Sequence, residues 1–117
     1  MQIQLNTDSR IQGAESLAVW VETELKDKLA RFRDQITRVE VHLSDINGDR
    51  GGGAEKRCLL EARLTGRQPV AVSHNADKVA DAVFGAADKM VRALDTSLGK
   101  VRKVKGGETI RGEGGLS

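Results

Sequence analysis

The segment Arg38-Val39-Glu40-Val41-His42-Leu43-Ser44 decides the fold, because its side chains alternate strictly between polar and apolar. Successive side chains of a β-strand point to opposite faces, so the apolar residues share one face and the polar residues share the other. Such a strand belongs to a sheet with one face buried in the core and the other face exposed to solvent. The segment therefore predicts a sheet that is covered by helices on a single side.

Three further segments show the same period of two: residues 2–6, residues 56–64 and the short stretch 70–73. The inward-facing side chains of the first two are expected to be Ile3, Leu5, Cys58, Leu60, Ala62 and Leu64. Polar or glycine-rich turns separate the segments, and residues 47–53 are predicted to form a flexible hairpin loop. The chain should thus contain four strands.

Two segments have a helical period instead. Apolar residues recur every four positions over residues 14–33, which predicts a helix with Gly13 as its N-cap. Asn75 is predicted to be the N-cap of a second helix. If this helix runs unbroken to about Val104 it is roughly 40 Å long, whereas Gly99 offers an earlier end. The apolar stripe of this second helix consists of Val79, Val83, Ala86, Met90, Leu94 and Val101.

The predicted order β-α-β-β-β-α indicates an α+β fold, a four-stranded mixed sheet with two helices packed on one face. The first helix leaves room for a parallel crossover between the first two strands, whereas short turns make the later strands antiparallel. We expect one domain over residues 1–104. Residues 105–117 are rich in glycine and lack a hydrophobic period, so we expect a flexible tail.

Composition narrows the function classes. The chain has 117 residues, a net charge of +2 and one cysteine, which excludes an internal disulfide and fits a reducing cytoplasm. The N-terminus lacks the basic and apolar regions of a signal peptide. No stretch approaches the roughly 18 apolar residues of a membrane span. We therefore expect a cytoplasmic protein that does not bind membranes.

Charges on the second helix sort by sign. At about 100° per residue, one flank carries the basic side chains Lys78, Lys89, Arg92, Lys100 and Lys103. The neighbouring flank carries Asp81, Asp88 and Asp95. A row of cations on a rigid helix can neutralise a line of phosphates, which favours RNA binding. The helical wheel taken alone favours a simpler interpretation, a solvated face with an Asp88–Arg92 ion pair.

A second basic cluster lies near the end of the first helix and consists of Lys26, Lys28, Arg31 and Arg33. Three acidic residues, Glu22, Glu24 and Asp27, dilute it. Basic side chains at a helix C-terminus also complement the helix dipole, which is a purely structural use. We include Lys28, Arg31 and Arg33 among the candidate RNA-binding residues.

The reactive residues do not form a recognisable catalytic or metal site. His42 is expected on the outward face of its strand, His74 just before the second helix, and Cys58 in the core. A zinc or nucleophile site needs several convergent groups. The glycines at 51–53 lack the ending of a phosphate-binding loop and lead into a strand. We therefore expect no enzyme, no cofactor, no metal and no small-molecule substrate.

The sequence resembles a known bacterial family. The resemblance is carried by the element order, by Gly85-Ala86-Ala87-Asp88-Lys89-Met90-Val91-Arg92-Ala93-Leu94, by Lys28-Leu29 and by Ile36-Thr37-Arg38-Val39-Glu40-Val41. It covers about residues 1–104. The family comprises the ribosome hibernation-promoting factors and ribosome-associated inhibitors, also labelled sigma-modulation protein or small-subunit ribosomal protein S30EA.

The resemblance implies binding to the small ribosomal subunit in the channel between head and body. Family members contact ribosomal RNA there, overlap the messenger and transfer RNA sites, and keep idle ribosomes inactive. By position, the resemblance assigns contacts to Lys28, Lys89, Arg92 and Lys100. The chain lacks the second domain through which long family members pair ribosomes, so we expect no pairing by that route and a monomer when free.

One alternative is a protein–protein interaction module that binds no RNA. The low net charge and the acidic flank Asp81, Asp88 and Asp95 motivate this alternative. The two hypotheses differ in the expected effect of replacing Lys89, Arg92 and Lys100 by glutamate. RNA binding should weaken and lose part of its salt dependence, whereas binding to a protein partner should not change.

Overall fold

The computed structural model describes residues 1–8, 11, 13–46 and 55–106, with residues 99–106 described by their backbone alone. The predicted order of four strands and two helices is confirmed. A short 3-10 helix, η1, follows the first helix. In chain order the elements are β1 (Gln2–Thr7), α1 (Ala14–Lys28), η1 (Ala30–Phe32), β2 (Ile36–Asp45), β3 (Lys56–Leu64), β4 (Val70–Ala76) and α2 (Val79–Gly106).

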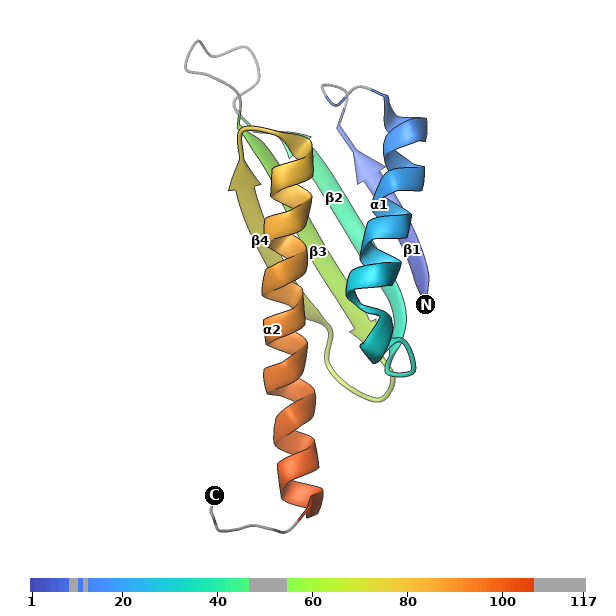
Figure 1. Cartoon of the computed structure of the whole chain (residues 1–117), viewed down its shortest axis with the longest axis vertical. Coiled ribbons are helices and arrows are strands. Elements are labelled where there is room, and N and C mark those ends of the chain that lie inside the picture. The colour runs from blue at the N-terminus through green and yellow to red at the C-terminus, as the bar shows by residue number, and fades with distance from the viewer. Residues whose placement is uncertain (9–10, 12, 47–54, 107–117) are drawn as a thin grey trace.

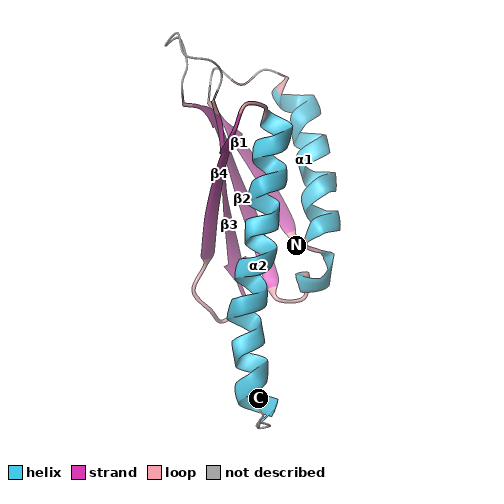
Figure 2. Cartoon of the chain, turned by 60° about the vertical axis from the view of Figure 1, so that its left-hand side comes forward, coloured by secondary structure: helices cyan, strands magenta, loops and turns pink. Residues whose placement is uncertain are grey.

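The strands form one mixed sheet in the order β1-β2-β3-β4. β1 pairs with β2 in parallel, and the other two pairings are antiparallel, as predicted. Both helices lie side by side on the same face, with α1 against β1 and α2 against β3 and β4 (Figure 1). Figure 2 shows that the opposite face is free of helices and that the last part of α2 extends beyond the sheet.

The core lies between the sheet and the helices. Val39, Val41 and Leu43 of β2 are buried, which confirms the inward face predicted from the alternation. The helices contribute a continuous set of fully buried side chains, which includes Val21, Leu25, Val83, Met90 and Leu94. Trp20 and Phe84 join the two helices through an edge-to-face ring contact with centroids 5.5 Å apart. This packing fixes the faces that α2 presents to α1, to the sheet and to solvent.

Two predicted boundaries were wrong. The first helix ends at Lys28 rather than near Arg33, and η1 completes the stretch. Asn75 does not cap the second helix, because the ladder between β3 and β4 continues to the pair Lys56–Ala76 and draws the backbone of Asn75 into β4. The Asn75 side chain instead donates a hydrogen bond to Glu55, with a nitrogen–oxygen distance of 3.1 Å.

The start of α2 is set by its own backbone. The carbonyl of Lys78 accepts a hydrogen bond from the amide of Ala82, so the helix begins directly after Lys78. The hairpin loop predicted at 47–53 and residues 107–117 of the predicted tail lie outside the described residues. Both remain predictions, as does the domain boundary at residue 104.

Candidate nucleic-acid interface

The acidic flank of α2 faces α1. Asp88 pairs with Lys28 across the two helices, with Nζ 3.2 Å from a carboxylate oxygen. Asp95 pairs with Arg31 of η1, with a nitrogen–oxygen distance of 2.7 Å. The Asp88–Arg92 pair expected from the sequence is not formed, because the packed neighbour α1 offers Asp88 a cation on the opposite side. The helical wheel could not show this neighbour.

These pairs compensate two of the candidate RNA-binding cations. The four side chains are between 42% and 59% exposed, so each pair contributes less than about 1 kcal/mol to stability. The guanidinium of Arg31 also lies over the ring of Phe32, 4.5 Å from its centroid. Arg33 is exposed after η1 and has no carboxylate partner among the described residues. The basic cluster of α1 is therefore partly neutralised where it meets α2.

The basic flank of α2 lies on the side towards β4. Lys89 is exposed, and its ammonium group donates a hydrogen bond to the carbonyl of Ser73 in β4 at 2.9 Å. Lys78 and Arg92 are exposed and pair with no carboxylate of the described part of the chain. The α2 backbone continues unbroken through Lys100 and Lys103, whose side chains lie outside the described set. This flank combines a rigid support with uncompensated positive charge.

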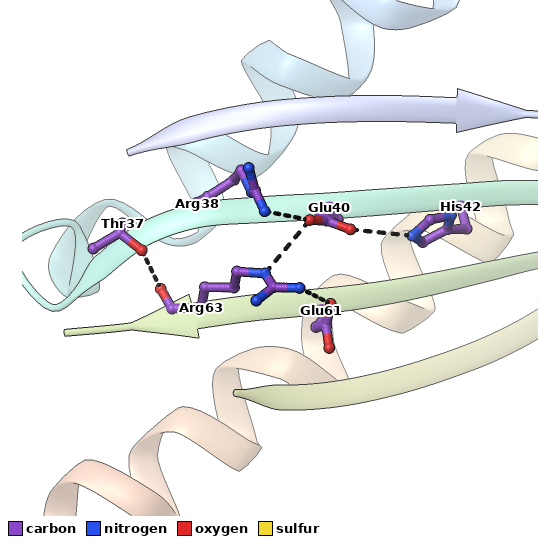
Figure 3. Close-up of polar contacts among 6 residues, drawn as sticks. All are labelled: Thr37, Arg38, Glu40, His42, Glu61 and Arg63. Carbon is purple, nitrogen blue, oxygen red and sulfur yellow. Dashed lines mark hydrogen bonds and ion pairs between the residues drawn. The ribbon is translucent and has the colours of Figure 1, made fainter. Parts of the chain in front are cut away.

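The open sheet face carries charges that compensate one another (Figure 3). One carboxylate oxygen of Glu40 pairs with the guanidinium groups of Arg38 and Arg63, at nitrogen–oxygen distances of 2.7 and 3.4 Å. The other oxygen lies 3.6 Å from Nε2 of His42. Glu61 lies directly opposite Glu40 in the strand register and also pairs with Arg63. Arginine and glutamate side chains thus pair with one another on this face. It offers an anion less free charge than the basic flank of α2.

The described residues provide little for bond-making chemistry. Cys58 is fully buried, and this burial raises the pKa of its thiol to about 12, which keeps it protonated. No three histidine, cysteine or acidic side chains of the described residues gather into a group that could hold a metal ion. Within the same residues, no helix is long and apolar enough to cross a membrane.

The sequence did not single out Arg67, an exposed cation beside α2. It lies in the turn between β3 and β4, and with Gly66, Gln68 and Ser97 it lines an open hollow beside α2. Nothing in the local sequence distinguished Arg67 from an ordinary turn residue. The packing of the turn against α2, some 30 positions later in the chain, creates the hollow.

Comparisons with known proteins agree on the fold. Residues 6–103 match a family model described as Sigma 54 modulation protein / S30EA ribosomal protein. The N-terminal domain of Protein Y from Thermus thermophilus superposes with a TM-score of 0.65 at 20% identity, covering 82% of this chain and 98% of that one. A ribosomal subunit interface protein from Coxiella burnetii superposes with a TM-score of 0.58 at 20% identity, covering 87% of this chain and 98% of that one. The comparison with curated proteins found no match.

Proposed function

The chain belongs to the Sigma 54 modulation protein / S30EA ribosomal protein family, and we propose from this premise that it is a ribosome-associated hibernation factor. In this proposal it binds small-subunit ribosomal RNA in the decoding channel and blocks the messenger and transfer RNA sites. It thereby holds idle ribosomes inactive in stationary phase or under stress. Such a role implies a cytoplasmic location.

The observation that carries this proposal is the uncompensated charge on the basic flank of α2. Arg92 and Lys78 present full positive charges to solvent, without a carboxylate partner in the described part of the chain. Cations held at fixed spacing can displace the counterions of an RNA backbone, and this release drives most of such binding. We assign the main contacts to Lys78, Lys89, Arg92, Lys100 and Lys103.

The cations at the end of α1 receive a secondary role. Lys28 and Arg31 each lie beside an α2 carboxylate, so an RNA phosphate must compete with an existing partner. Arg33 follows η1 and carries no such partner within the described residues. We expect these three residues to add less affinity than the basic flank of α2.

The alternative of a protein-interaction module loses part of its support. It was motivated by three carboxylates on one flank, and two of them, Asp88 and Asp95, pair with cations of α1 and η1. Asp81 alone has no partner in the described part of the chain. A surface whose charges are internally paired attracts a charged partner less than an unpaired one.

Sedimentation tests the proposal. In sucrose gradients of stationary-phase lysate, the chain is expected in the ribosomal fractions at low salt and increasingly at the top of the gradient at high salt. Recovery only at the top at low and moderate salt would exclude ribosome binding. Replacing Lys89, Arg92 and Lys100 by glutamate should abolish the association, whereas a protein-interaction module would keep its partner.

A matched pair of single variants controls for net charge. Arg92→Glu and Arg57→Glu make the same charge change at exposed arginines that lack carboxylate partners among the described residues. Arg92 lies on α2, whereas Arg57 precedes the buried Cys58 in β3 and points to the open face. Arg92→Glu should weaken ribosome binding about tenfold or more, and Arg57→Glu by less than about twofold. Equal effects would contradict the assignment of the interface to α2.

A further inference from the structure

The hollow between the β3–β4 turn and α2 combines groups from two distant parts of the chain. Gly66, Arg67 and Gln68 line it from the turn, and Ser97 lines it from α2. Figures 1 and 2 show the turn beside the part of α2 that leaves the sheet. We propose that this hollow binds a phosphate group of RNA, with Arg67 as the cation that holds it. This inference rests on the proposed function and extends its interface.

The chemistry of the lining fits a phosphate. A guanidinium presents its N–H donors as a planar fork that matches two phosphate oxygens. The hydroxyl of Ser97 and the amide of Gln68 can donate further hydrogen bonds. None of the four lining residues is acidic, so no fixed negative charge opposes an anion in the hollow. Donors without a competing carboxylate favour an anionic ligand.

Arg67, like Arg33, Arg57 and Arg92, has no carboxylate partner among the described residues. Arg31, Arg38 and Arg63 each pair with at least one carboxylate. Arg67 is exposed and makes no such pair with the described residues. An arginine that the fold leaves without a counterion, at the edge of a hollow, has its full donor set available to a ligand.

The turn is held in place before any ligand arrives. Gly66 has a φ of 69°, a left-handed conformation that glycine adopts without strain. The amide of Thr65 donates to the carbonyl of Gln35 at 3.0 Å, which ties the start of the turn to the residue just before β2. Pro69 restricts the backbone on the other side. A preorganised turn loses less conformational entropy when Arg67 binds a phosphate.

The hollow adjoins the basic flank of α2 along the helix. At about 100° per residue Ser97 follows Val79 by five full turns, so it lies on the stripe of α2 that faces the sheet, beside the basic flank. A nucleic-acid backbone that follows the basic flank can therefore place one phosphate in the hollow while neighbouring phosphates contact the helix. Arg67 would widen the RNA interface from one helix to the helix and a turn. A free phosphate ion would lack those neighbouring contacts.

The first test compares Arg67→Glu with Arg57→Glu in ribosome binding across a salt series. Both substitutions reverse one exposed arginine without a carboxylate partner among the described residues. Arg67→Glu is expected to weaken binding about fivefold or more and to reduce the salt dependence by about one phosphate contact. Arg57→Glu should change affinity by less than about twofold. Identical behaviour of the two variants would overturn the proposal.

The second test follows the backbone amides of Gly66, Gln68 and Ser97 by NMR in the full chain. A short single-stranded oligoribonucleotide should shift these signals in the wild type and leave them unshifted in Arg67→Glu. Inorganic phosphate at equal ionic strength separates the two sources of the ligand chemistry. Shifts with phosphate but not with the oligonucleotide would overturn the RNA assignment, as would shifts with neither.

The two tests also separate this inference from the proposed function. If the wild type does not sediment with ribosomes but the oligonucleotide shifts the hollow, the hibernation role fails and the phosphate site stands. If the wild type sediments with ribosomes and Arg67→Glu behaves as Arg57→Glu does, the phosphate site fails and the hibernation role stands.

Discussion

The imidazole ring of His74 in β4 lies so close to Gly85 in α2 that a Cβ at position 85 would overlap it. This contact brings the helix backbone directly onto the strand. Four residues later, Lys89 donates to the carbonyl of Ser73, the residue before His74. The glycine and the lysine together hold the basic flank of α2 along β4.

Gly85→Ala should destabilise the protein by about 1–3 kcal/mol, because the new methyl group overlaps the whole imidazole ring rather than a flexible side-chain end. The opposite expectation comes from helix propensity, which favours alanine over glycine by about 1 kcal/mol. Urea denaturation decides between them. The double variant Gly85→Ala/His74→Ala should be less destabilised than the sum of the two single variants. A more stable Gly85→Ala protein would contradict the close contact.

Asp95→Asn removes the partner of Arg31 and should lower the free energy of unfolding by less than about 1 kcal/mol, because both side chains are well exposed. The loss should shrink further at high salt, which screens the ion pair. Asp81→Asn is the matched control, since Asp81 has no partner among the described residues. A large, salt-independent loss in Asp95→Asn would show a buried role that the structure does not indicate.

Burial of Cys58 makes stability depend on alkaline pH. The folded pKa is raised to about 12 from an ordinary value of 9.0, so the folded state holds the thiol proton more tightly than the unfolded state. This contribution is complete below pH 9.0 and is lost as pH rises towards about 12, by up to about 1.4 kcal/mol per pH unit. Urea denaturation across this pH range should show a flatter stability curve for Cys58→Ala than for the wild type.

Glu40→Gln separates stability from binding. It removes the carboxylate that compensates Arg38 and Arg63, and should lower the free energy of unfolding by about 1–3 kcal/mol. Ribosome sedimentation should stay within about twofold of wild type, because Glu40 lies on the open sheet face, away from α2. Thermal unfolding and gradient profiles on the same sample provide both measurements. If the Glu40→Gln protein is folded but no longer sediments with ribosomes, the interface lies on the open sheet face and not on α2.

The local periodicity of the sequence was enough to predict the four strands, the two helices and the buried face of β2. A period of two or of about 3.6 is a property of neighbouring residues, and burial of the apolar positions then follows from it. The same spacing separated the acidic from the basic flank of α2. The length of β4 was not predicted, because pairing with β3 overrode the capping preference of Asn75. The end of α1 at Lys28 was not predicted either.

Tertiary structure decided which charges are available to a partner. In the sequence Lys28 and Arg92 look alike, because each is a cation on the polar face of an amphipathic helix. Packing places Asp88 beside Lys28, whereas no carboxylate of the described residues pairs with Arg92. Packing also brings Arg67 and Ser97 to one hollow. Periodicity places a side chain on a face of its own element. The counterion of that side chain depends on which element packs against the face, and this is set only when the whole chain folds.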